Sequence, residues 1–141
     1  DQPETAMESR DPGDQQLSAF LRAMARASFA WGTCDCALVM ADWCRVRRGV
    51  DPAARLRGRY RTARGARRTV RRRGGFETVV RALMTESGFA TTESPRTGDV
   101  GLVAHPRVGP ACAIRCPLGW AVKSPAGLAL GPWPARVAWR V

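Results

Sequence analysis

Apolar positions in the first half of the chain recur at the three- and four-residue spacing of amphipathic helices. A first helix is expected over residues 14–28, with Asp14 as a good N-cap residue. A second is expected over residues 36–48, because Asp35 is a good N-cap residue and Gly49 is a natural residue after a last helical turn. The apolar positions of the first helix are Leu17, Phe20, Leu21, Met24 and Ala27.

Further helical segments are expected before residue 88. Asp51 followed by Pro52 predicts a short helix over residues 51–56, since proline suits a first helical position. Glycines divide the arginine-rich stretch 55–73 into turns or short helices. An amphipathic helix then begins near Phe76 and closes at Gly88.

Beyond Gly88, short apolar runs bounded by Gly and Pro replace the helical pattern. Runs of this length and spacing predict antiparallel strands joined by turns. They cover residues 100–104, 111–116, 120–123, 127–130 and 136–141. The chain is therefore expected to fold as one α+β domain over residues 14–141, with N-terminal helices packed on a small antiparallel sheet. Residues 1–13 are expected to form a flexible N-terminal arm.

Charge is concentrated in one part of the sequence. The formal net charge is +11, and thirteen arginines against one acidic residue lie between Arg45 and Arg73. Such a stretch faces solvent or an anionic partner, and its candidate binding residues are Arg59, Tyr60 and Arg61. Nucleic-acid phosphates, acidic neighbours in an assembly, anionic cell-wall polymers and simple solvation of helix faces all stay open as interpretations.

Membrane and metal signals are weak. The sequence has no apolar run of eighteen residues and no basic segment followed by an apolar one at its start, so neither a membrane span nor a signal peptide is expected. Five cysteines without framework spacing predict reduced thiols. Only Cys112 and Cys116 have the spacing of a zinc-ligand pair, so no metal site and no cofactor are expected.

Cys36 is the main candidate for chemistry. It falls in the first turn of the predicted helix, directly after Asp35. Free N–H groups and the positive end of the helix dipole favour a thiolate at such a position. A thiolate is the form of cysteine that acts as a nucleophile. The alternative is a small buried cysteine with no reactivity.

These residues also carry a family resemblance. Trp31-Gly32 followed by Asp35-Cys36-Ala37-Leu38-Val39 resembles the nucleophile signature of NlpC-type papain-like cell-wall peptidases, most closely the phage tail and prophage variant. Residues 95–103, with Gly98-Asp99, are similar to the Pro-Gly-Asp-Leu-Val strand of that family, and residues 138–140 resemble its phage-type Ala-Trp-Arg ending. The resemblance implies a papain-like fold with Cys36 as nucleophile. It also implies a turn containing Trp31, Gly32 and Asp35 beside the oxyanion site.

The histidine of that family has no counterpart at its expected place. It opens the strand after the Gly-Asp strand, where this chain has Ala111-Cys112-Ala113-Ile114. The single histidine, His105, is the remaining candidate base, and a bulge near Pro106 would be needed to turn it toward Cys36. Asp99 either orients that histidine or closes a turn entering the strand.

The resemblance implies a virion protein of a phage tail, cytoplasmic before assembly, whose partners are other tail proteins and peptidoglycan. If active, it is expected to hydrolyse amide bonds of peptidoglycan stem peptides during cell entry, with Cys36 attacking the carbonyl. The first alternative is a catalytically degenerate structural or adaptor protein of the tail tip. The second is a basic nucleic-acid-binding protein.

Overall fold

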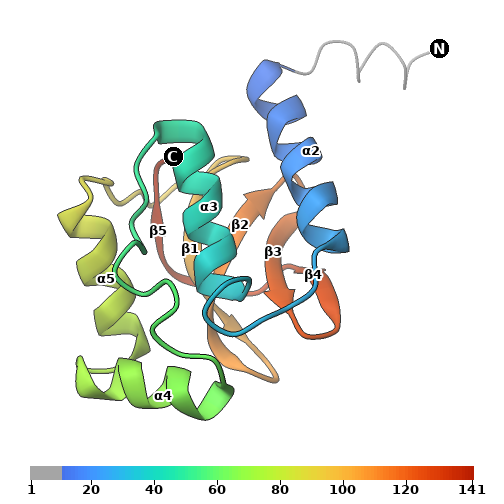
Figure 1. Cartoon of the computed structure of the whole chain (residues 1–141). Helices are drawn as coiled ribbons and strands as arrows, with labels where there is room; N and C mark the ends of the chain where they lie inside the picture. Colours follow the sequence, from blue (N-terminus) through green and yellow to red (C-terminus); the bar gives the residue numbers. More distant parts are fainter. Residues whose placement is uncertain (1–10) are drawn as a thin grey trace.

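Four helices precede five strands in residues 11–141, the part of the chain that the computed structural model describes (Figure 1). The helices are α2 (Pro12–Arg26), α3 (Cys36–Arg48), α4 (Ala63–Arg72) and α5 (Phe76–Glu86). The strands are β1 (Val100–His105), β2 (Gly109–Cys116), β3 (Gly119–Ser124), β4 (Gly127–Gly131) and β5 (Ala135–Trp139). The prediction of an α+β domain with helices first and an antiparallel sheet second is confirmed. No helix within this part of the chain has the length and apolar character to cross a bilayer.

One predicted helix start and one predicted short helix are wrong. The helix expected from residue 14 begins at Pro12, because Asp11 is the residue that caps it, and Asp11 Oδ1 accepts a hydrogen bond of 2.7 Å from the Asp14 N–H. The last part of the expected arm is therefore helical, while residues 1–10 lie outside the described residues. The short helix expected over residues 51–56 is a series of turns. Here the Gly58 N–H donates to the Gly32 carbonyl at 2.9 Å, which draws this segment toward the start of α3.

The sheet has the strand order β4-β3-β2-β1-β5, and every neighbouring pair is antiparallel. β1 pairs with β2 along its whole length, from Val100 opposite Ile114 to His105 opposite Gly109. The pairing of β2 with β3 ends at Ile114 and Ala121, while β3 continues alongside β4 to Ser124. β2 and β3 therefore diverge on the N-terminal side of Ile114 in β2. In that part of β2, the backbone groups that face away from β1 have no strand partner.

Alternate residues of the sheet enter two different clusters, as the two-residue period of a strand requires. The face toward α3 holds Val100, Leu102, Cys112, Ile114 and Trp139, which pack with α3 residues including Val39, Met40 and Trp43. The opposite face holds Val103, Ala111, Ala113, Trp120, Val122 and Ala138. Figure 1 shows α3 lying against one face of the sheet.

Candidate functional site

Asp35 fixes the backbone at the start of α3. Its side chain is only 2% exposed. Oδ1 accepts the Leu38 N–H at 3.0 Å, which is the helix cap, and Oδ2 accepts the Gly32 N–H at 3.0 Å and the Tyr60 hydroxyl at 2.7 Å. One carboxylate thus holds a turn, a helix start and a distant loop together. The predicted N-cap role of Asp35 is confirmed.

Gly32 is required by its surroundings. It has a φ of +86°, and a Cβ at this position would lie 1.9 Å from the Tyr60 carbonyl oxygen. Any larger residue would push the loop away from Asp35. Trp31, the preceding residue, packs edge-on against Phe29 with ring centroids 4.9 Å apart. The Trp-Gly turn therefore shapes the entry to α3.

Cys36 is the first residue of α3 and is half-buried. Its sulfur meets the thiol and backbone N–H of Cys112 and the N–H of Ala37. The Arg115 N–H donates to the Asp99 carbonyl on the β1 side. Because N–H groups alternate in direction along a strand, the N–H of Cys112 points the other way, toward β3. β3 has diverged from β2 at this point, so the Cys112 N–H is available. The separation of β2 and β3 thus leaves the Cys112 N–H free to donate to the Cys36 sulfur.

These donors lower the pKa of Cys36 below its ordinary value. The hydrogen bond from the Cys112 thiol is the largest cause, and it outweighs burial and the nearby Asp35 charge, which both act in the opposite direction. The same contact, together with burial, raises the pKa of Cys112 well above its ordinary value. Burial also raises the pKa of Cys34, and that of Cys44 to about 12. The contact therefore favours ionisation at Cys36 over ionisation at Cys112.

His105 is held by other groups at the end of β1. It is the last residue of β1 and shares a face of the sheet with Val103. Its ring packs on Trp133, with ring centroids 4.6 Å apart. Its Nδ1 accepts the backbone N–H groups of Arg107 at 3.1 Å and Val108 at 3.3 Å. The irregularity in β1 falls between Leu102 and Val103, on the β5 side, rather than near Pro106. None of these contacts joins His105 to Cys36.

Asp99 is also engaged elsewhere. It is 4% exposed, and its carboxylate accepts the N–H groups of Arg96 at 2.8 Å and Val141 at 3.0 Å. Arg140 lies 3.5 Å from it. These contacts close the turn before β1 and fasten the last residues to it. They agree with the structural alternative for Asp99 and leave no contact with His105.

Tyr60 and its neighbours separate into two roles. Tyr60 was a candidate binding residue, but it is 8% exposed and its hydroxyl is bound to Asp35. Burial, followed by the Asp35 charge, raises the pKa of Tyr60 far above its ordinary value. Arg59 and Arg61 are exposed on either side of it. Tyr60 therefore anchors the loop, while the two arginines face solvent.

Sequence reasoning missed Lys123, which β3 places next to the site. This residue is 3% exposed, and its Nζ donates to the carbonyls of Met24, at 2.7 Å, and Ala27 at the end of α2. Its charge partly offsets the effect of burial on the pKa of Cys34. The signal was present, because Lys123 is the only lysine in the sequence and lies in an apolar run. A lysine in such a run needs buried acceptors.

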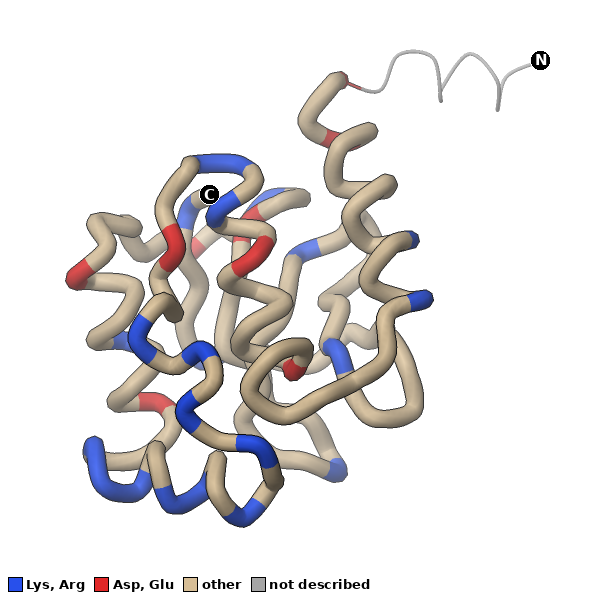
Figure 2. Tube along the Cα trace, in the orientation of Figure 1, with Lys and Arg blue, Asp and Glu red and all other residues tan. Residues whose placement is uncertain are grey.

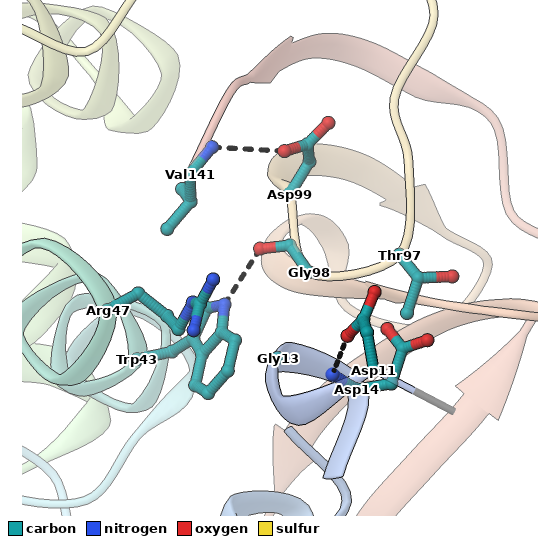
Figure 3. Close-up of a pocket in the computed structure, with 9 residues that line it drawn as sticks. All are labelled: Asp11, Gly13, Asp14, Trp43, Arg47, Thr97, Gly98, Asp99 and Val141. Carbon is teal, nitrogen blue, oxygen red and sulfur yellow. Dashed lines mark hydrogen bonds between the residues drawn. The ribbon is translucent and has the colours of Figure 1, made fainter. Parts of the chain in front are cut away.

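A hollow lies beside the second half of α3. A cavity of about 110 Å³ is lined by Asp11, Gly13, Asp14, Trp43, Arg47, Thr97, Gly98, Asp99 and Val141 (Figure 3). Its walls are tied by the Trp43 Nε1–H donating to the Gly98 carbonyl at 2.7 Å and by the Asp99–Val141 contact. Ligand pockets usually measure about 300 Å³ or more, so this cavity suits only water-sized occupants. In residues 11–141 no group of three His, Cys, Asp or Glu side chains is placed to hold a metal ion.

The fold and the site define a small α+β domain that presents a hydrogen-bonded thiol at the start of a helix on an antiparallel sheet. Residues 9–141 match a family model described as "Domain of unknown function (DUF6950)", and the chain belongs to that family. Neither a curated protein nor a solved structure matches the chain.

Proposed function

We propose that this chain is a catalytically silent NlpC-like domain that serves as a structural or adaptor piece of a phage tail tip. One observation carries the proposal. The sulfur of Cys36 is surrounded by a second thiol, two backbone N–H groups and a buried carboxylate, and no imidazole of the described residues acts on it. The scaffold for a thiol nucleophile is present without the base that such a nucleophile needs.

The position of Cys112 supports this interpretation. By the resemblance, the histidine of NlpC-type peptidases falls at Ala111, which packs in the cluster with Val103 and Trp120. Cys112, one residue later, is the group that faces Cys36. Amide hydrolysis requires a group that takes up a proton and later gives it to the leaving amine. Since the pKa of Cys112 is raised, its thiol stays protonated at neutral pH and does not act as that base.

The other polar side chains near Cys36 are committed to the fold. The Asp35 carboxylate already accepts hydrogen bonds from the Gly32 N–H, the Leu38 N–H and the Tyr60 hydroxyl. The Lys123 ammonium is bound to carbonyls at the end of α2. Neither group is free to move a proton to a substrate. A role in assembly fits these contacts better than turnover, and placement in a phage tail rests on the resemblance of the Trp-Gly and Asp-Cys motif to the tail variant.

A peptidase remains the second candidate, and a specific observation favours it. The pKa of Cys36 is lowered, first by the Cys112 thiol, and N–H groups of Ala37 and Cys112 converge on its sulfur. Donors gathered at a helix start are also what an oxyanion site uses. On this reading Cys36 would attack an amide carbonyl of a peptidoglycan stem peptide, and a group of the substrate or a water would have to move the proton.

Two measurements test the proposal. The first compares the wild-type chain with Cys36→Ala for release of new amino groups from purified peptidoglycan. We expect both to stay at the level of a no-protein blank. Release by the wild type that Cys36→Ala abolishes would establish the peptidase instead.

The second measurement asks whether the chain belongs to a tail. Tails purified from a phage that encodes this chain are analysed by quantitative mass spectrometry after washing at high salt. We expect the chain at a fixed ratio to the other tail proteins. Its absence from washed tails would refute the adaptor role, whatever the peptidoglycan assay shows.

A further inference from the structure

An exposed group of arginines has no partner within the described chain. We define the arginine surface as the eight residues Arg59, Arg61, Arg64, Arg67, Arg68, Arg71, Arg72 and Arg73, all of which are exposed. None of them forms an ion pair or side-chain hydrogen bond with any residue in 11–141. Their neighbours differ, since Arg55 pairs with Glu86, and Arg57 pairs with Asp42 and Asp51.

Helix α4 arranges most of this surface on one side. Arg64, Arg67, Arg68, Arg71 and Arg72 recur at the three- and four-residue spacing that brings side chains to one helix face. Ala66 and Val70 lie on the other side and pack against the cluster that holds Leu56 and Tyr60. Figure 2 shows the basic positions gathered along α4 and the segment leading into it. The hydrophobic contact thus fixes the helix with its arginines facing outward.

The arrangement is unfavourable for the isolated chain. Like charges three or four residues apart on a helix repel, and α4 has no acidic residue in its first turn or elsewhere in its ten residues. The loop before the helix adds further positive charge without a counter-charge. A bound polyanion relieves this repulsion, which makes the surface suited to a partner with closely spaced negative charges.

The composition of the surface favours phosphate over an acidic protein. The centres of protein interfaces combine arginine with apolar and aromatic anchors. The exposed large apolar residues of the described chain are Val46, Val50, Val108, Leu118 and Leu130, and none lies between residues 55 and 73. Guanidinium groups, in contrast, bind phosphate oxygens through paired N–H donors. The arginine surface therefore has donors for phosphates and lacks the anchors of a protein interface.

The same composition favours a duplex over a single strand. Single-stranded nucleic acid is held by aromatic side chains on which bases stack. Tyr60 is the only aromatic residue in 55–73, and it is buried with its hydroxyl bound to Asp35. We infer that the arginine surface binds the phosphate backbone of double-stranded nucleic acid.

The inference goes beyond the proposed function and stands independently of it. Binding of the full chain to a fluorescent DNA duplex of mixed sequence is measured by anisotropy over a salt series. The test variant changes Arg64, Arg67, Arg68 and Arg71 to Gln. The matched control changes four exposed arginines elsewhere to Gln, namely Arg22, Arg26, Arg96 and Arg107. Both variants lose the same charge, and circular dichroism establishes that each is folded.

We expect the control to bind nearly as the wild type does. The α4 variant should lose at least about tenfold in affinity. The magnitude of its slope of log K against log salt should fall by about 3.6, since each of the four lost phosphate contacts contributes about 0.9. Equal weakening by both variants would overturn the inference, because net charge alone would then explain binding. Equal or tighter wild-type binding to polyglutamate or to a single strand would also overturn it. If the α4 variant unfolds, changing only Arg72 and Arg73 at its end, against a control that changes only Arg96 and Arg107, gives the same comparison with half the charge change.

Discussion

Tyr60 and Asp35 are joined by a hydrogen bond of 2.7 Å between residues 25 positions apart. Through this contact the carboxylate that caps α3 also holds the segment that leads into α4. The candidate thiol site and the arginine surface therefore share one buried polar connection. Loss of this connection is expected to affect both regions, and it can be tested directly.

Tyr60→Phe should destabilise the domain by about 2 kcal/mol, because a buried carboxylate loses a charge-assisted hydrogen bond. Asp35→Ala should cost more, about 3 kcal/mol or above, since it leaves the Gly32 N–H, the Leu38 N–H and the Tyr60 hydroxyl without an acceptor. Urea unfolding followed by tryptophan fluorescence measures both. The double variant should lose less stability than the sum of the two single losses. Full additivity would show that the contact contributes nothing.

Gly32→Ala is expected to be among the most damaging single changes in the chain. Its new Cβ would meet the Tyr60 carbonyl at 1.9 Å, and the residue has a positive φ. We expect a loss of about 3 kcal/mol or failure to fold. Gly58→Ala is the matched control, because Gly58 also has a positive φ but has no atom within 4 Å of the added Cβ. Its cost should stay near 1 kcal/mol, and similar costs for the two variants would contradict the steric explanation.

Cys36 should be the most rapidly alkylated of the five cysteines at about pH 7, because its pKa is lowered and it is only half-buried. Iodoacetamide labelling followed by peptide mass mapping gives the rates. Cys112→Ala should slow labelling of Cys36, since the thiol contact that contributes most to its lowered pKa is removed. Cys44, buried and with a pKa of about 12, is the unreactive reference. Faster labelling at Cys34 than at Cys36 would show that the site does not hold a thiolate.

Asp51 should make stability depend on pH in the acid range. Burial raises the pKa of Asp51, but hydrogen bonds from Arg57 and the Ala53 N–H, with the charges of Arg57 and Arg45, outweigh it and bring the pKa below 3.8. Because the folded-state pKa is lower than the unfolded one, this stabilisation is present above about pH 4 and is lost as the pH falls through the folded value. Asp51→Asn should lower stability at about pH 6 and remove part of the loss seen on acidification. An unchanged acid profile in Asp51→Asn, measured by urea unfolding, would contradict this.

Local signals predicted much of the fold. The α3 bounds followed from Asp35 and Gly49, and all five strands lie where short apolar runs stand between Gly and Pro. The errors occurred where a tertiary contact overrides a local preference. Asp51-Pro52 has the local features of a helix start, but the Gly58 N–H to Gly32 carbonyl bond holds the following residues in turns. No local pattern contains that contact.

The candidate site was predicted only in part, for a similar reason. The position of Cys36 at a helix start is a local property, and it was confirmed. Its partner Cys112 depends on where β2 and β3 separate, and strand divergence leaves no mark in the sequence. His105 was considered because it is the only histidine, whereas its contacts with Trp133 and the turn N–H groups depend on the β1–β2 connection. The buried position of Lys123 depends on where α2 ends.

The two outer strands of the sheet differ in exposure. Beside β5, the Thr92 N–H donates to the Ala138 carbonyl and the Arg140 N–H to the Ala90 carbonyl, so the segment after α5 covers that margin. In residues 11–141 no segment pairs with the outer side of β4, where Leu130 is 67% exposed. Strands added by another chain can therefore extend this sheet in only one direction, which makes β4 the place where concentrated protein would begin to self-associate.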